Sequence, residues 1–504
     1  MRFYTVLKKN CRRSVGITGN NMLFFAFNLF YRIISGFLVE ESVKKCFLFA
    51  LFMFFSFSVN AETNVYNIMM MGVNIGKSTE TWEEKTDSYG NCVLSLNSVS
   101  EMTIARGGFS LSMNSDTSLS VDCKTFKPLT IKARVSEMGS ETLSEGREEN
   151  GIFRTKITKN GVNESSSLKL GDNVTFFGMI FRKLDEKKLL QGGKTSIISE
   201  ESLAESEISY SASKNTDGTL SVTVNFQGIP IKYTVSGKKV IRSEMQNGLL
   251  VYYLRGSVPE QDTPVNVQKA DLLDSSKIAN SGISIKYPRK TSKTVFAVES
   301  ANFSEIPETC FQKKEETGTL IVVNSAATCV TSPAISDISS NIEEDSGNPD
   351  IVRTAQKTVL GAPNQEEMVK RIAKFVYKHI KNKNYNHGTL SASEVLRSQS
   401  GDCTEHSSLF AALARAVGIP AKMVYGLVMD PSGQFFFHNW NEAFADGKWI
   451  SVDSTFGIVP ADSSRITLIY GGSDSKSREN VSVSVLKFMN NTKIAVQGFS
   501  NENR

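Results

Sequence analysis

The segment "GDCTEHSSLFAALARAVGIP", Gly401–Pro420, decides the fold of the C-terminal part of this chain. Its apolar residues recur with helical spacing, and Asp402 and Glu405 form the Asp-x-x-Glu pattern of a capping box. The Gly-Ile-Pro sequence that closes the segment is typical of the end of a helix. We therefore predict a helix whose first residue is Cys403.

Cys403 lies among polar residues, in a position that suits a reactive thiol better than a packed one. At the start of a helix, unpaired backbone N–H groups and the positive end of the dipole stabilise a thiolate. The same N–H groups can donate hydrogen bonds to an oxyanion. Gln399 and Ser400, just before the cysteine, are candidates for a second oxyanion donor.

The N-terminal part of the chain has the pattern of a targeting region. An apolar run of 14 residues, Cys46–Val59, follows Lys44 and Lys45 and precedes a small-residue cleavage pattern. A run of this length is typical of a signal peptide and is too short for a spanning helix. We assign residues 1–61 to targeting and predict an exported protein, periplasmic or extracellular. A second apolar run, Met22–Val39, leaves open a misplaced start codon or a true membrane tether.

The positive charge of the chain belongs to this leader. Eight of the 57 Lys and Arg residues and two of the 52 Asp and Glu residues precede residue 62, which leaves 49 against 50 and a net charge of −1. The remainder therefore has no overall basic field, and we expect no nucleic-acid partner.

Five of the seven cysteines follow the leader, and their spacing suggests how they pair. Cys92–Cys123 and Cys310–Cys329 are natural pairs in an oxidising compartment. Cys403 is then the odd thiol, and catalysis is one reason for an exported protein to keep it.

The chain divides into regions of different pattern. Residues 62–270 read as short alternating strands and predict a large antiparallel β domain, without catalytic or metal spacing of His, Cys or acidic residues. Residues 271–350 form a strand-rich connecting region, whose end, Ser332–Asp350, reads as a linker or exposed loop. Residues 351–504 should form an α+β catalytic domain with C-terminal strands.

Two helices should precede the cysteine helix. Asn364 is a plausible N-cap for the first, whose apolar stripe continues to Ile380. Ser391 and Glu394 form a capping box at the start of the second.

A hairpin after the cysteine helix carries the two other candidate catalytic residues. His438 lies in the aromatic strand Phe435–Phe444, and Asp453 lies in the next strand, beyond an Asp-Gly-Lys turn. On adjacent strands, the carboxylate could orient the imidazole toward the thiol, which is the logic of a catalytic triad. We predict Cys403 as nucleophile, His438 as base and Asp453 as orienting residue.

The other histidines have different expected roles. His379 lies near the apolar stripe of its helix and should be structural, whereas His387 lies in a turn and should be solvated. His406 follows Cys403 by three residues and should shape the site or pack beneath it. A Cys-x-x-His pair can bind zinc, but no second such pair exists, so we expect no metal and no cofactor.

Three stretches, "GDCTEHSSLFAALARAVGIPAKMVYGLV", "HNWNEAF" and "KWISVDSTFG", resemble the transglutaminase-like superfamily of bacterial cysteine hydrolases. The resemblance covers about residues 360–475. It implies a papain-like core, in which the cysteine helix packs on an antiparallel sheet, and the same triad. Asn439 replaces an alanine of many members, and Ser454 replaces a proline, but neither change removes a catalytic group.

Trp440 and Glu442 share the side of the strand on which His438 lies. Trp440 could shield the thiol from water. Glu442 could be a structural hydrogen-bond partner or face the substrate.

The favoured hypothesis is an exported thiol hydrolase or acyl transferase that acts on peptide or isopeptide amide bonds. Its partner would be a protein or peptide substrate, with cell-envelope peptides among the candidates. Hydrolysis is favoured over cross-linking because water is abundant and nothing in the sequence marks an amine pocket. The alternatives are a non-catalytic envelope protein that binds through its β domain, against which an intact triad argues, and a scaffold whose enzyme acts only with a partner.

Overall fold

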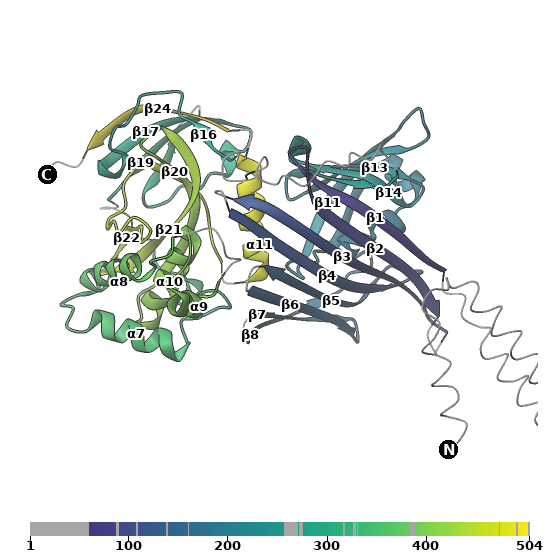
Figure 1. The fold of residues 1–504 in the computed structure, drawn as a ribbon, viewed down its shortest axis with the longest axis horizontal. Coiled ribbons are helices and arrows are strands. Elements are labelled where there is room, and N and C mark those ends of the chain that lie inside the picture. Colours follow the sequence, from purple (N-terminus) through teal and green to yellow (C-terminus); the bar gives the residue numbers. More distant parts are fainter. Residues whose placement is uncertain are drawn as a thin grey trace, which may run out of the picture. The chain divides into compact units, whose positions relative to one another are not determined.

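The computed structural model describes residues 60–504, except 87–89, 107–108, 138–139, 160, 257–270, 272–275, 316–317, 326–328, 330, 384–389, 473, 490–491 and 502–504 (Figure 1). The predicted leader therefore lies outside the described residues, apart from Asn60 and Ala61, which open the first strand. Within the described part of the chain, none of the helices combines the length and the apolar character that crossing a bilayer requires.

The N-terminal region forms one predominantly antiparallel sheet, which confirms the predicted β domain. Two meanders meet where β1 pairs with β15, and the strand order is β8 to β1 followed by β15 to β9. The strands are β1 (Asn60–Met70), β2 (Val73–Thr86), β3 (Cys92–Arg106), β4 (Phe109–Asp122), β5 (Pro128–Glu137), β6 (Ser140–Glu149), β7 (Ile152–Lys159), β8 (Val162–Lys169), β9 (Thr175–Phe176), β10 (Gly193–Ile198), β11 (Glu205–Lys214), β12 (Leu220–Phe226), β13 (Ile229–Ser236), β14 (Lys239–Met245) and β15 (Leu250–Leu254).

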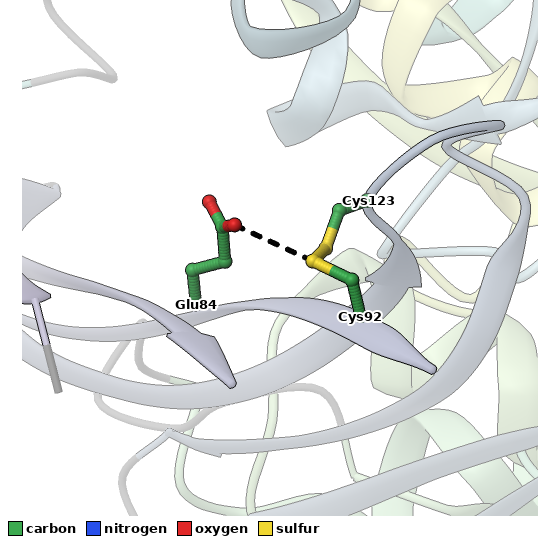
Figure 2. A group of neighbouring side chains, drawn as sticks. All are labelled: Glu84, Cys92 and Cys123. Carbon is green, nitrogen blue, oxygen red and sulfur yellow. Dashed lines mark hydrogen bonds between the residues drawn. A yellow bond between two sulfur atoms is a disulfide. The ribbon is translucent and has the colours of Figure 1, made fainter. Parts of the chain in front are cut away.

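Both predicted disulfides are present. Cys92 and Cys123 join the start of β3 to the end of β4, and Glu84 Oε1 lies 3.4 Å from the sulfur of Cys92 (Figure 2). Because both sulfurs are in the disulfide, neither offers a thiolate, and this Glu-Cys-Cys cluster is not a metal site. Cys310 and Cys329 form the second bond. Two disulfides indicate an oxidising environment.

Four helices open the C-terminal region: α7 (Pro349–Val359), α8 (Gln365–His379), α9 (Ala392–Ser398) and α10 (Cys403–Ala416). The last three confirm the predicted helices. Asn364 caps α8 by accepting from the N–H of Glu367, and Ser391 begins the capping box of α9. Local capping rules were sufficient here because each cap is formed within four residues.

The segment Ser332–Asp350 was predicted to be a linker or an exposed loop, and the expectation of exposure is wrong for part of it. Glu344 and Asp345 are buried. Glu344 Oε2 lies 3.2 Å from Nη1 of Arg415 in α10, and Asp345 accepts from the N–H of Ser393 in α9. Its polar side chains therefore anchor the segment to the helices.

The second sheet carries the predicted hairpin. It consists of β16 (Ile278–Ala279), β21 (Gln434–Ala445), β20 (Ala421–Met429) and β23 (Arg465–Tyr470), in this order, and β22 (Lys448–Val452) pairs with β21. Phe410 and Leu413 of α10 share a buried cluster with Met423 of β20 and Ala443 of β21. The cysteine helix therefore packs on an antiparallel sheet, while the full papain-like arrangement remains a prediction.

The chain ends in a third sheet of β18 (Gln312–Glu315), β19 (Thr319–Val323), β17 (Thr291–Ser300) and β24 (Thr492–Asn501). Helix α11 (Ser475–Phe488) precedes β24 and was not predicted. Its sequence "VSVSV" alternates like a strand, which hides the helix from a pattern search. Arg478 of α11 forms an ion pair of 2.6 Å with Glu164 of β8.

Candidate active site

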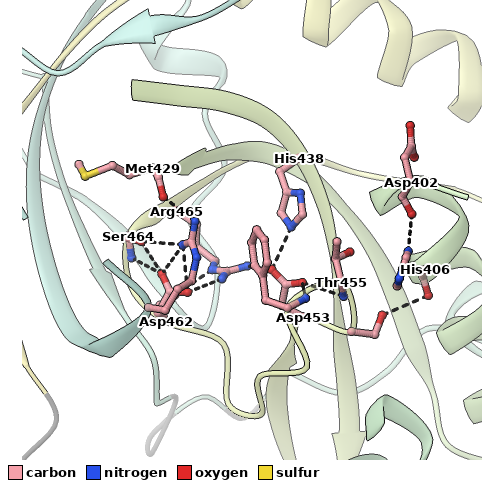
Figure 3. Close-up of polar contacts among 12 residues, drawn as sticks. Asp402, His406, Met429, His438, Asp453, Thr455, Asp462, Ser464 and Arg465 are labelled. Carbon is pink, nitrogen blue, oxygen red and sulfur yellow. Dashed lines mark hydrogen bonds and ion pairs between the residues drawn. The ribbon is translucent and has the colours of Figure 1, made fainter. Parts of the chain in front are cut away.

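The hairpin β21–β22 brings together His438 and Asp453, the histidine and the aspartate that were predicted to be catalytic. Asp446 and Gly447, with φ of 49° and 79°, form its tight turn. His438 lies on β21, and Asp453 directly follows β22. His438 Nε2 is 2.9 Å from Asp453 Oδ2, and the two residues are only 6% and 0% exposed (Figure 3).

The carboxylate of Asp453 has donors on both oxygens. Oδ1 accepts from the backbone N–H groups of Thr455 and Phe456, at 3.0 and 3.1 Å, and Oδ2 also accepts from Arg465 Nη1, at 2.9 Å. Burial by itself raises the pKa of Asp453, but the charges and hydrogen bonds of His438 and Arg465 hold this pKa below its usual range. Asp453 is therefore ionised at neutral pH.

Asp453 belongs to a network of ion pairs that extends through Arg465 to Asp462 (Figure 3). Arg465 Nη2 lies 2.6 Å from Asp462 Oδ2, and Arg289 Nη1 lies 3.2 Å from the same oxygen. None of these three residues was predicted from the sequence, since all three lie outside the motif stretches that carry the family resemblance. The available signal was Arg465 at the start of the otherwise apolar strand "RITLIY".

Cys403 is the first residue of α10, is half-buried and takes part in no disulfide. The predicted capping box is present: Asp402 accepts from the N–H of Thr404 at 2.7 Å, and Glu405 accepts from the N–H of Asp402 at 2.9 Å. The helix dipole and the first-turn N–H groups therefore act at the cysteine.

Side-chain hydrogen bonds join this helix to the hairpin and the residue after Asp453, and two of them come from residues next to His438 and Asp453. Asn439 donates to Thr404 Oγ1 at 3.1 Å, and Ser454 donates to the carbonyl of His406, also at 3.1 Å. These are the two positions at which the sequence departs from many transglutaminase-like proteins. Each departure thus adds a link between the first turn of α10 and a neighbour of His438 or Asp453.

The remaining histidines occupy different environments. His406 is fully buried, its Nδ1–H donates to the carbonyl of Asp402 at 2.5 Å, and burial lowers its pKa to about 4, so its ring is neutral. His379 donates to the carbonyl of Leu396 at 2.8 Å, in keeping with a structural role. His387 lies outside the described residues.

Trp440 and Glu442 are buried on the same strand as His438. The Trp440 ring is 6.3 Å from the imidazole, and the guanidinium of Arg465 lies 5.1 Å over it. Both oxygens of Glu442 accept from Tyr470 Oη, at 3.1 and 2.9 Å. These contacts favour Glu442 as a structural hydrogen-bond partner over Glu442 as a residue that faces the substrate.

Phe456 was also missed by sequence analysis. Its ring stacks on His438 at 5.0 Å, and Arg289 lies 4.4 Å over the same ring. Because Phe456 remains 38% exposed, it covers the imidazole and also offers an aromatic surface to a bound molecule.

Gln399 and Ser400 hold the loop that leads to Cys403. Gln399 ends α9 in the left-handed conformation, with φ of 54°, and its carbonyl accepts from the N–H groups of Lys381 and Asn382. Ser400 Oγ donates to the carbonyl of Asn382 at 3.2 Å. A role of either residue at an oxyanion remains a prediction.

Replacing Glu442 with glutamine should flatten the pH dependence of stability. Burial raises the pKa of Glu442 to about 7, so the native state holds this proton more tightly than the unfolded chain does. The free energy of unfolding should then fall by about 3 kcal/mol between pH 4.5 and pH 8 because of this group, and Glu442→Gln should remove that fall. Urea unfolding at several pH values measures it. Exposed Glu299→Gln should leave the profile unchanged, and equal profiles for wild type and Glu442→Gln would contradict the assignment.

The site combines a thiol at a helix N-terminus with a buried His–Asp pair, and the hairpin that carries the pair is hydrogen-bonded to the helix. Cysteine hydrolases use sites of this class. Residues 352–454 match the family model of the Transglutaminase-like superfamily. The recognition made from the sequence is confirmed, and this segment is a transglutaminase-like core.

Comparison with curated proteins gives relatives of the same kind. Over 87 residues the chain is 31% identical to the kyphoscoliosis peptidases of Mus musculus and Homo sapiens. This stretch is 16% of the present chain and covers 13% of each peptidase, so the chain matches only a small part of their length.

Solved structures show only distant likeness. A proposed cysteine protease from Cytophaga hutchinsonii is 16% identical, with 45% of this chain and 86% of that chain covered and a TM-score of 0.27. A β-barrel-like protein from Brucella abortus is 11% identical, with 39% and 94% covered and a TM-score of 0.28. Such low TM-scores carry no weight for the fold.

Proposed function

We propose that this protein is an exported thiol hydrolase that cleaves peptide or isopeptide amide bonds through Cys403, His438 and Asp453. The observation that carries the proposal is the buried contact of 2.9 Å between His438 Nε2 and Asp453 Oδ2, on a hairpin bonded to the helix that Cys403 begins. The leader pattern and the two disulfides support export.

The contact also assigns roles to the two ring nitrogens. Because ionised Asp453 can only accept, Nε2 of His438 carries a proton, and Nδ1 is the nitrogen that exchanges a proton with the thiol. The Cys403 thiolate attacks the amide carbonyl, and backbone N–H groups at the start of α10 donate to the oxyanion. His438 then protonates the leaving amine. Water, deprotonated by His438, hydrolyses the thioester and restores the thiol.

A proteome-derived peptide library with blocked amines tests this reaction across many candidate substrates at once. Wild-type protein should expose new N-termini, and Cys403→Ala should expose none. A parallel incubation with monodansylcadaverine measures transfer to an amine. Hydrolysis without incorporation of the amine supports a hydrolase, whereas incorporation in excess of cleavage would indicate cross-linking. Intact wild-type protein that does neither would favour the non-catalytic alternative.

Asp453→Asn should lower turnover by roughly ten- to a thousand-fold while the protein remains folded. The amide can donate to His438 Nε2 and so allow the wrong tautomer, a change that costs on the order of 10⁴ in a serine triad. A thiolate depends less on the carboxylate, which is why we expect a smaller loss. The measurement is kcat, together with the melting temperature.

Glu442→Gln is the matched control for Asp453→Asn, because it removes another buried carboxylate of the same hairpin. It should retain turnover. Wild-type turnover in a well-folded Asp453→Asn variant would show that the third member of the triad is another residue.

A further inference from the structure

Arg465, on β23, donates to the same carboxylate oxygen of Asp453 as His438 does. Its Nη1 and Nε2 of His438 both lie 2.9 Å from Oδ2 of Asp453. Oδ1 is occupied by two backbone N–H groups. Asp453 is fully buried, so these four donors take the place of water around the carboxylate.

The protonation state of Asp453 decides the tautomer of His438. An ionised carboxylate can only accept, so it requires a proton on Nε2 and leaves Nδ1 able to take the thiol proton. A protonated carboxyl would donate to Nε2 and place the ring proton on Nδ1, where the ring could no longer act as base toward the thiol. Burial alone favours the protonated carboxyl.

We propose that Arg465 is a positioning residue, which keeps Asp453 ionised and thereby holds His438 in the Nε2–H tautomer. This inference rests on the proposed function and adds to it a residue outside the triad. Arg465 acts through Asp453, to which its Nη1 donates.

The guanidinium is held in a geometry that a lysine cannot reproduce. Arg465 Nη2 lies 2.6 Å from Asp462 Oδ2, and its Nε donates to the carbonyl of Asp462 at 2.9 Å, while Nη1 is directed at Asp453. An ammonium group lacks this fixed fork. Arg465→Lys should therefore lose at least one of these three contacts.

Other charged or titratable groups surround Asp453 without donating to its oxygens. Arg289, in the turn before β17, and Lys383, after α8, both act on Asp453 by charge. Lys383 Nζ donates to the carbonyl of Thr455 at 3.1 Å. His406, on α10, is neutral because of its burial. Arg289 and Lys383 should thus retain part of the effect when Arg465 is replaced.

The first consequence concerns the acid side of the pH–rate profile. Arginine lowers the pKa of Asp453, so activity should be lost only well into the acid range, and removal of the guanidinium should move this loss to higher pH. We expect Arg465→Gln to shift the acid limb of kcat/KM upward by about one pH unit. Arg289→Gln keeps the Arg465–Asp453 contact and should therefore shift the acid limb of kcat/KM by less. Addition of guanidinium to Arg465→Gly should move the limb back.

The second consequence is a direct readout of the ring, which needs no turnover. The chain has only four histidines, so ¹⁵N-histidine labelling gives an interpretable spectrum. In a Cys403→Ala background, which removes the thiol proton, the neutral ring of His438 should be the Nε2–H tautomer. The Arg465→Gln change should raise the share of the Nδ1–H tautomer as the pH is lowered toward the range in which Asp453 takes up a proton.

These two measurements separate the inference from the proposed function. An Nδ1–H tautomer of His438 in the Cys403→Ala protein overturns the inference without any further variant, even if Arg465→Gln does not fold. Unshifted acid limbs and an unchanged tautomer in a folded Arg465→Gln protein also overturn it. A wild type without turnover but with the Nε2–H tautomer supports the role of Arg465 and instead contradicts the hydrolase assignment.

Discussion

Replacing Cys403 with alanine should abolish amide cleavage, with a loss of roughly 10⁴-fold or more in kcat, because single losses of a nucleophile in related mechanisms reach about 10⁶. The thiol is the group that would form the thioester, and the four other cysteines among the described residues are held in disulfides. The peptide-library assay measures the loss.

The melting temperature of Cys403→Ala should stay close to that of wild type. The side chain is half-buried at the first position of α10, and alanine is a good helix former. Cys403→Ser is the second control, since its hydroxyl preserves volume but ionises far less readily than a thiol. Substantial cleavage by purified Cys403→Ala would refute the nucleophile assignment.

Replacing His438 with glutamine should reduce kcat/KM by roughly 10³-fold or more, by analogy with the removal of a triad base. The glutamine amide can still donate to Asp453 Oδ2, which should preserve the fold, but it can neither accept the thiol proton nor protonate the leaving amine. The measurement is kcat/KM for a peptide from the library, with melting as the folding control.

His379→Gln is the matched control for this variant. His379 donates to the carbonyl of Leu396, a contact that a glutamine amide can replace, so turnover should remain close to that of wild type. Loss of turnover in His379→Gln together with its retention in His438→Gln would reverse the two assignments.

Local features of the site could be predicted from the sequence because their partners lie close along the chain. The capping box of Asp402 and Glu405 spans four residues, and His438 and Asp453 are 15 residues apart across one tight turn. Turn chemistry and strand alternation are sufficient at such distances. The predicted α10 and the predicted His–Asp proximity both follow from these rules.

The charged support of the site could not be predicted in the same way. Arg289 and Asp462 form an ion pair although they are 173 residues apart in the sequence. Nothing in the local sequence around either residue identifies the other as its partner. Arg465 is only 12 residues from Asp453 in the sequence. Whether its side chain points toward Asp453 depends on how β23 pairs with β20. Sequence patterns indicate that a buried arginine needs partners, whereas the tertiary fold decides which ones it finds.

For the segment Ser332–Asp350, the polar composition led to a wrong prediction of exposure. Glu344 and Asp345 read as solvated loop residues, yet they bind Arg415 and the backbone of Ser393 from buried positions. A buried ion pair and a buried helix contact use the same residue types as an exposed loop. Composition alone therefore cannot separate the two.

The most direct test of the central claim is the rate at which iodoacetamide alkylates Cys403 at pH 6, followed by mass spectrometry beside N-acetylcysteine. With a pKa of about 8.5, less than about 1% of the model thiol is thiolate at this pH. A thiol at the start of α10 and activated by His438 should react at least about tenfold faster, and His438→Gln should reduce this advantage. A wild-type rate equal to that of N-acetylcysteine, unchanged in His438→Gln, would contradict the account.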